Sequence, residues 1–232
     1  MPKIIFRPNP TPPPFPPPTP PVIKPLTFTA KEDGCRIGYI YYSEDYEVQD
    51  AGLNIEYSLD GGQTWLPYTM STDESSAQMI NLDNGETVLF RGNNQNLAYY
   101  LEDEGEYQGT KFIVEGTIAA SGDVSSLLNG IGGVLTAPAY CYAYMFNSCT
   151  SLTQAPALPA TTLANACYTN MFYGCTLLSH IEALFTTTPG ASYTNNWVNG
   201  VAQNGTFVKS SEATWDVSGV NGIPTGWTVT TN

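Results

Sequence analysis

The sequence has 232 residues, of which 12% are charged, and 21 acidic residues against eight basic ones give a formal net charge of −13. Nucleic-acid binding depends on clustered lysine and arginine, so this charge excludes a nucleic-acid partner and also argues against an anionic membrane surface. No run of 18 apolar residues predicts a membrane span, and without an export signal the five cysteines are expected to be free thiols.

The first unit in chain order, residues 1–25, is a tail that holds twelve of the 18 prolines. Prolines at this density exclude helix and favour an extended polyproline II conformation. Two interpretations stay open, a stiff linker or an anchor that docks a groove on a partner. We expect the anchor, because only seven residues precede the proline run and leave a linker nothing to connect. Its candidate contact residues are Ile4, Ile5, Phe6, Arg7 and Phe15.

The second unit, residues 26–118, is predicted to be all-β. Leu53, Ile55 and Tyr57 alternate with polar residues, which is the period of a half-buried strand. Further windows with strand character, separated by Gly- and Asn-rich turns, are 26–30, 36–42, 64–68, 78–82, 86–91 and 111–115. About seven short strands at this spacing favour an immunoglobulin-like β-sandwich.

One hairpin of this unit carries a recognisable turn motif. The motif residues Ser58, Asp60, Gly62 and Trp65, with Thr64, resemble the Asp box of sialidase propellers. The resemblance implies a folded turn, in which the aspartate binds hairpin backbone and the tryptophan packs underneath. A single copy cannot build a propeller, so we expect a structural role and no active site.

Other residues of chemical interest have less specific patterns. Glu102–Glu106 is an acidic loop whose carboxylates would suit calcium binding or glycoside hydrolysis, although a solvated turn is the expectation. His180 is the only histidine, and no nucleophile motif accompanies it. Six tyrosines form a candidate surface for stacking against sugars or proteins, with half of them expected in the core by strand alternation: Tyr39, Tyr41, Tyr42, Tyr46, Tyr99 and Tyr100.

The third unit, residues 119–232, contains a repeat of 26 residues. Met145-Phe146-Asn-Ser-Cys149-Thr and Met171-Phe172-Tyr-Gly-Cys175-Thr are equivalent, as are Cys141 and Cys167 upstream of them. A period of 20–29 residues is typical of a leucine-rich-repeat solenoid, with one strand and one helix in each coil. The spacing of four between Leu163, Cys167, Met171 and Cys175 predicts an apolar helical stripe, started by Thr161 or Thr162 as N-cap.

The same cysteines give no metal site. Cys141 and Cys149, like Cys167 and Cys175, lie eight residues apart, which is about 12 Å along a helix. Zinc ligands all lie about 2.3 Å from one ion, and a disulfide needs Cα atoms within about 7 Å. We therefore predict reduced, buried thiols and no metal or other cofactor.

The repeats resemble the BspA-like leucine-rich repeats of surface proteins of gut Bacteroidetes and of the phages that infect them. The resemblance rests on Met-Phe-x-x-Cys-Thr-x-Leu together with Ala-Pro-Ala-Leu-Pro-Ala-Thr-Thr-Leu-Ala (155–164), and it extends to a lead-in at 118–128 and to a closing cap after 183. It covers residues 115–232 well and 26–114 loosely. It implies surface display and adhesion and supplies no catalytic residue. This chain has only about two full repeats, which limits any concave recognition surface.

These observations predict a mainly β protein with short helices, composed of an extended tail, a sandwich and a short capped solenoid. We expect a non-enzymatic phage virion protein, a head fibre or a capsid or tail decoration. Its tail would dock on other virion proteins, and its domains would contact a host-surface glycan or protein. A bacterial cell-surface adhesin is the alternative, and the missing export signal favours the virion. A homo-oligomer is expected, because several copies would raise a weak single-site affinity through multivalency.

Overall fold

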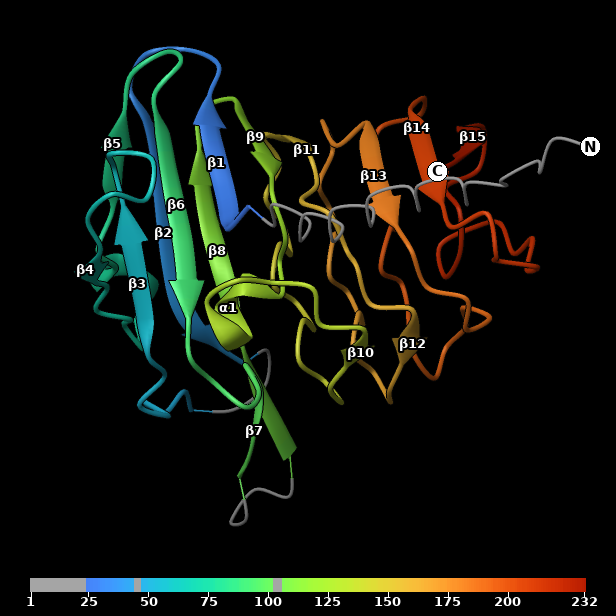
Figure 1. The fold of residues 1–232 in the computed structure, drawn as a ribbon, viewed down its shortest axis with the longest axis horizontal. Helices are drawn as coiled ribbons and strands as arrows, with labels where there is room; N and C mark the ends of the chain where they lie inside the picture. The colour runs from blue at the N-terminus through green and yellow to red at the C-terminus, as the bar shows by residue number, and fades with distance from the viewer. Residues whose placement is uncertain (1–23, 44–46, 102–105) are drawn as a thin grey trace, which may run out of the picture.

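The structure is a computed structural model that describes residues 24–43, 47–101 and 106–232. Within these ranges the chain is mainly β, and its only α-helix, α1 (Ser126–Asn129), has four residues. Two stacked sheets occupy one end of the molecule, and a β-solenoid-like region of about four turns occupies the other (Figure 1). The strands are β1 (Leu26–Ala30), β2 (Cys35–Tyr42), β3 (Ile55–Ser58), β4 (Leu66–Pro67), β5 (Ile80–Leu82), β6 (Thr87–Gly92), β7 (Tyr99–Leu101), β8 (Glu106–Glu115), β9 (Ile118–Ser121), β10 (Thr136–Ala137), β11 (Leu152–Gln154), β12 (Thr162–Leu163), β13 (His180–Ala183), β14 (Thr206–Lys209) and β15 (Thr228–Thr231).

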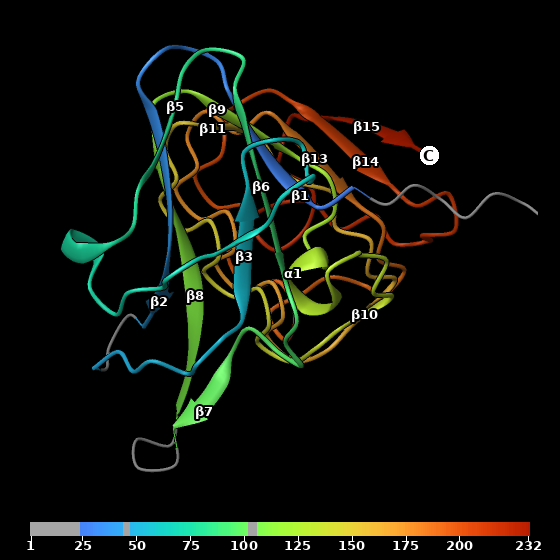
Figure 2. The ribbon, with the colours of Figure 1, turned by 60° about the vertical axis from the view of Figure 1, so that its left-hand side comes forward.

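The two sheets of the N-terminal region lie face to face (Figure 2). The first has the order β11-β9-β1-β6-β3-β4 and the second the order β5-β2-β8-β7. Their apolar residues alternate, so that Val88 and Phe90 of β6 both point inward and are fully buried. The rings of Phe28 (β1) and Phe112 (β8) meet between the layers, with centroids 4.8 Å apart. β1 and β2 lie in different sheets, whereas the first two strands of a constant-type immunoglobulin domain share one sheet.

Each of the seven windows predicted as strands contains a strand. The main difference is β8, which begins at Glu106 and not at Lys111, because its first residues form a hairpin with β7. That hairpin mixes exposed residues, Tyr100, Glu106 and Tyr107, with a buried polar one, Gln108, so its sequence shows no alternation of apolar and polar types that would have predicted it. β7 itself was not predicted.

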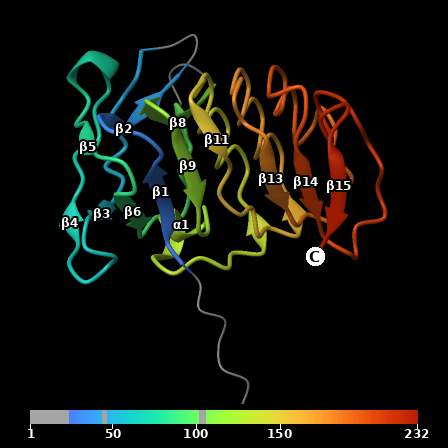
Figure 3. The same ribbon diagram turned by 90° about the horizontal axis from the view of Figure 1, so that it is seen from above.

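The solenoid-like region continues the first sheet. β11 pairs in parallel with β9, and beyond it β13, β14 and β15 form a parallel sheet in which Ile181, Phe207 and Val229 are level with one another. Figure 3 shows these strands one after another along the long axis. The predicted boundary between 118 and 119 falls inside β9, which pairs with β1 on one side and with β11 on the other.

The prediction of a helix in each coil is wrong. Residues 139–148 and 165–174, which we call turn ribbons 1 and 2, consist of consecutive turns, and Thr162 lies in β12 where a helix N-cap was expected. Every fourth residue of ribbon 1 is left-handed, with φ of 59° at Tyr140, 62° at Tyr144 and 60° at Ser148. The ribbons therefore have a period of four residues, close enough to the 3.6 of a helix to give the same apolar pattern.

Backbone hydrogen bonds explain why a ribbon replaces the helix. The N–H groups of Ala143 and Met145 donate to carbonyls three residues earlier, at 2.9 and 3.3 Å. Between them, the N–H groups of Tyr142 and Tyr144 donate to the carbonyls of Cys167 and Thr169 in ribbon 2, at 3.0 and 2.9 Å. An α-helix would satisfy its N–H groups internally and leave none to join neighbouring coils. In the ribbon, alternate N–H groups donate to carbonyls of their own turn and to carbonyls of the next coil.

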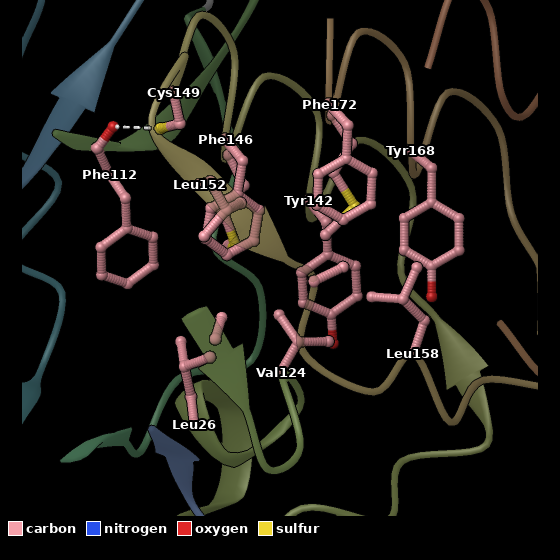
Figure 4. Close-up of a cluster of buried hydrophobic side chains, with 14 of the residues drawn as sticks. Leu26, Phe112, Val124, Tyr142, Phe146, Cys149, Leu152, Leu158, Tyr168 and Phe172 are labelled. Carbon is pink, nitrogen blue, oxygen red and sulfur yellow. Dashed lines mark hydrogen bonds between the residues drawn. The ribbon is translucent and has the colours of Figure 1, made fainter. Parts of the chain in front are cut away.

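One hydrophobic core runs through both regions. The rings of Phe112, Phe146 and Phe172 are stacked, with successive centroids 5.3 and 5.4 Å apart (Figure 4). Phe112 belongs to β8 of the sandwich, while the other two belong to ribbons 1 and 2. The Cys149 thiol reinforces the junction by donating to the carbonyl of Phe112 at 3.2 Å. The two-sheet region, called the sandwich below for its two facing sheets, and the solenoid-like region thus share one core.

Candidate functional site: a tyrosine groove

A pocket opens where the end of the second sheet meets ribbon 1. Its tyrosines come from three places in the chain: Tyr42 ends β2, Tyr107 opens β8, and Tyr140 and Tyr144 belong to ribbon 1. The other lining residues are Ser43, Ala98, Glu106, Gln108, Gly109 and Ala143. We call this site the tyrosine groove. Its volume of about 90 Å³ is below the roughly 300–1,000 Å³ of enclosed ligand pockets, so it is too small to enclose a ligand of ordinary size.

The tyrosines of the groove are ordered by ring contacts. The rings of Tyr107 and Tyr140 are stacked, with centroids 4.0 Å apart and planes 9° apart, and Tyr100 packs beside Tyr107 at 5.1 Å. Tyr42 and Tyr144 form a second pair at 5.6 Å. Tyr100 and Tyr107 are 51% and 40% exposed, so ring surface is available to a ligand at this edge.

Two of these tyrosines have an unfavourable backbone conformation. Tyr140 and Tyr144 are left-handed, which costs an L-residue about 1–2 kcal/mol. The equivalent residues of ribbon 2, 26 positions later, are Ala166 and Asn170, a small residue and one that tolerates this conformation. The left-handed conformation itself belongs to the ribbon architecture, because Ser148, Ala166 and Asn170 share it. What distinguishes ribbon 1 is that two tyrosines, both lining the groove, occupy these positions.

Hydrogen bonds fix the groove floor. The buried Gln108 side chain accepts from the backbone N–H of Gln49 at 2.9 Å and from the Tyr99 hydroxyl, and it donates to the carbonyl of Glu47. These bonds tie the segment after β2 to the β7–β8 hairpin. Desolvation by burial raises the pKa of Tyr99 to about 12, so its hydroxyl keeps its proton and this bond well into the alkaline range.

The chemistry of the groove is that of recognition. It offers aromatic faces, phenol hydroxyls and one exposed carboxylate, Glu106. Asn165 donates through Nδ2 to the Tyr140 hydroxyl at 3.0 Å, which leaves the Tyr140 proton to donate elsewhere. Lys111 lies over the Tyr42 ring at 5.0 Å and adds a positive charge close by.

The sequence located this site in part. Of the six tyrosines it singled out, Tyr39 and Tyr41 are buried in the core, and Tyr99 is half-buried and bonded to Gln108 of the groove floor. Tyr42 lines the groove and Tyr100 packs against its edge, while Tyr46 lies outside the described residues. It did not single out Tyr107, Tyr140 or Tyr144. A comparison of the two repeats could have found Tyr140 and Tyr144, because the second repeat has the smaller residues Ala166 and Asn170 at the equivalent positions.

The Asp60 hairpin lies between β3 and β4, apart from the groove. The Asp60 carboxylate accepts from the Ser58 hydroxyl at 2.8 Å and from the backbone N–H of Thr64 at 2.9 Å. The Trp65 indole donates to the carbonyl of Gly62 at 3.0 Å, and the Gly62 N–H donates to Ser58 Oγ. Hydrogen bonds from Thr64 first, and then from Ser58, lower the pKa of Asp60 to about 2.

The predicted repeat residues lie in the solenoid core. Cys141, Met145, Phe146, Cys149, Cys167, Met171, Phe172 and Cys175 are all buried. The five cysteines of the chain are buried and unbridged. Burial raises the pKa of Cys141, Cys149 and Cys167 to about 12, and raises that of Cys175 as well. Cys175 donates to the carbonyl of Phe146 at 3.0 Å, repeating one coil later the bond of Cys149 to Phe112.

Several predictions fall outside the described residues. These are the candidate anchor residues Ile4, Ile5, Phe6, Arg7 and Phe15, and the acidic loop apart from Glu106. In the part of the chain that the structure describes, no three histidine, cysteine or carboxylate side chains converge as a metal site. The same part contains no helix long and apolar enough to cross a membrane.

Comparison with protein-family models, with curated proteins and with solved structures finds nothing that matches this chain. The functional argument therefore depends on the residues described above.

Proposed function

We propose that this protein is a non-enzymatic structural and adhesion protein of a phage virion, a head fibre or a capsid or tail decoration. Residues 1–25 attach it to other virion proteins, and the remainder is displayed outward. The motif resemblance of the repeats to BspA-like proteins supports this setting. The proposal includes an immunoglobulin-like sandwich fold for the two-sheet region, in the broad sense of two facing β-sheets. This region would carry the solenoid away from the particle.

The observation that carries the binding role is the tyrosine groove. Tyr140 and Tyr144 keep a left-handed backbone at a cost of about 1–2 kcal/mol each, and they place aromatic rings in the groove where the second repeat has Ala166 and Asn170. Natural sequences accept such local conflicts mainly at functional sites. A continuous core behind the groove holds it rigidly, as a displayed recognition surface requires.

Mass spectrometry of purified phage particles tests the virion assignment. We expect stoichiometric amounts of the protein in intact particles. Deletion of residues 2–21 should leave a folded protein that no longer joins the particle, with the far-UV circular dichroism of the intact chain as the control for folding. Full incorporation of the truncated protein would show that the tail is not the anchor. Recovery from bacterial outer membranes, and not from particles, would favour the cell-surface adhesin.

A further inference from the structure

We propose that the tyrosine groove binds the proline-rich segment of a second copy of this chain, residues 8–21, and that this contact assembles the homo-oligomer. The proposal rests on the binding role given to the groove above and names its occupant as a neighbouring copy, so host-surface contact is left to the rest of the displayed surface. It holds wherever the protein is displayed, and its test is separate from that of the virion assignment.

The first argument is chemical complementarity. A proline-rich polyproline II strand has no internal hydrogen bonds and almost no N–H groups, so it presents apolar rings and carbonyl acceptors. Such strands dock on aromatic-lined grooves. The tyrosine groove offers stacked rings at Tyr107 and Tyr140, and a Tyr140 hydroxyl whose oxygen already accepts from Asn165, which directs its proton to another acceptor.

The second argument is charge. Residues 1–31 contain four basic residues and no acidic one, whereas residues 32–115 contain 17 acidic residues against three basic ones. Arg7 directly precedes the proline run, and Glu106 is an exposed carboxylate of the groove. The positive charge of Lys111 beside the groove is balanced by Glu74 at 3.9 Å, so the opposite charges of the tail and the acidic region steer association. A neutral saccharide carries no charge and would gain no such attraction from the acidic residues, so the charge distribution favours the basic tail as the ligand.

The third argument selects a second copy over the same chain. Only three residues, 22–24, separate the proline run from Pro25, and the N–H of Asp123 holds the carbonyl of Lys24 at 2.9 Å. Lys24 and Pro25 therefore lie beside the first sheet, whereas the groove lies at the end of the second. A polyproline II rod of this length spans about 43 Å and resists folding back. It reaches a groove on another molecule more readily than its own.

The experiment uses the full-length protein and measures self-association by sedimentation velocity. A synthetic peptide of residues 1–25 in excess should compete with the tails and shift the oligomer to monomer. A control peptide, with alanine in place of Pro12, Pro13, Pro14, Pro16, Pro17 and Pro18, should have no effect, since it keeps the charges and loses the rod.

Groove variants test the binding site without risking the fold. Tyr140→Ala and Tyr144→Asn each introduce the residue found at the equivalent position of ribbon 2, where the left-handed backbone is tolerated. We expect each variant to stay folded with a melting temperature lowered by no more than a few degrees, since each loses a surface ring contact, and self-association weakened about tenfold, the effect of losing one well-packed aromatic contact. Tyr173→Ala, which removes a 42% exposed tyrosine outside the groove, is the matched control and should leave association unchanged.

Three outcomes would overturn the proposal. One is a monomeric full-length protein at 100 µM or more. Another is an oligomer that neither the peptide nor the groove variants affect. The third is a groove variant that loses binding to a panel of bacterial polysaccharides while its self-association is unchanged, because the groove would then belong to saccharides. Each outcome is independent of whether the protein is found in virions.

Discussion

The sandwich and the solenoid-like region share one core but differ in charge. Residues 32–115 carry 17 acidic side chains, whereas residues 116–232 carry four, Asp123, Glu182, Glu212 and Asp216. The repeat architecture explains the difference. Coils place equivalent residues directly above one another, about 4.8 Å apart, and like charges at that distance would repel. Hydroxyl residues occupy such positions instead, as where Thr176 donates to the carbonyl of Thr150 at 3.3 Å.

The two regions also differ in how they satisfy the backbone. The sandwich uses mainly antiparallel ladders between strands such as β2 and β8, while the ribbons share their N–H groups between turns and neighbouring coils. The groove forms at the boundary, where a ribbon packs against a sheet edge. Ribbon 1 is the first ribbon of the solenoid-like region, so on one side it packs against the second sheet and not against another coil. Residues distant in sequence therefore meet at this boundary.

Thiol reactivity gives the largest expected contrast between folded and unfolded protein. Burial raises the pKa of the Cys141, Cys149 and Cys167 thiols from 9.0 to about 12, which lowers the thiolate fraction near neutral pH about a thousandfold. We expect native protein to resist a disulfide reagent at pH 7.5 and denatured protein to titrate five thiols. Two or more missing thiols after denaturation would show that the solenoid core is cross-linked.

Truncation of the aromatic stack should break the coupling of the two regions. Phe146 is fully buried between Phe112 of the sandwich and Phe172 of ribbon 2. Phe146→Ala should lower the free energy of unfolding by about 3–5 kcal/mol, measured by urea denaturation. The unmodified protein should unfold in one transition by both tryptophan fluorescence and circular dichroism, and separate transitions would contradict the single core. The exposed Tyr173→Ala, within about 0.5 kcal/mol of the unmodified protein, is the control.

Substitution by glycine distinguishes a ribbon from a helix by the sign of its effect. Ala166 is left-handed, with φ of 51°, so Ala166→Gly should raise the free energy of unfolding by about 0.5–1 kcal/mol as strain is relieved. In a helix the same change would lower it by about 1 kcal/mol. Ala164→Gly, just before the ribbon and without a positive φ, should be destabilising by a similar amount. Thermal unfolding of both variants decides the point.

The smallest effect is expected at the exposed Asp60 hairpin of the sandwich. Hydrogen bonds from Thr64 and Ser58 lower the pKa of the Asp60 carboxyl from 3.8 to about 2, so the folded state favours the charged carboxylate. The stabilisation is therefore complete above about pH 4 and is lost as the pH falls towards 2. Asp60→Asn should be less stable than the unmodified protein at pH 7, and the difference should shrink towards pH 2. A difference independent of pH would mean that shape and not charge holds the turn.

Local pattern was sufficient for much of the fold. Alternation located all seven predicted strands, and the 26-residue period located the solenoid and its buried positions, from Cys141 to Cys175. The spacing of Ser58, Asp60 and Trp65 indicated their turn, because all its partners are close in sequence. In each case the information is carried by neighbouring residues.

Only the tertiary structure decided where the backbone hydrogen bonds go. A spacing of four between apolar residues fits a helix and a turn ribbon equally, and the choice depends on carbonyls of the next coil, such as that of Cys167 for the Tyr142 N–H. The groove was decided in the same way. Tyr42, Tyr107 and Tyr140 share no local pattern, and they meet because ribbon 1 packs against the start of β8. Periodicity determines which side chains turn inward, whereas contacts between distant segments determine which partners they find there.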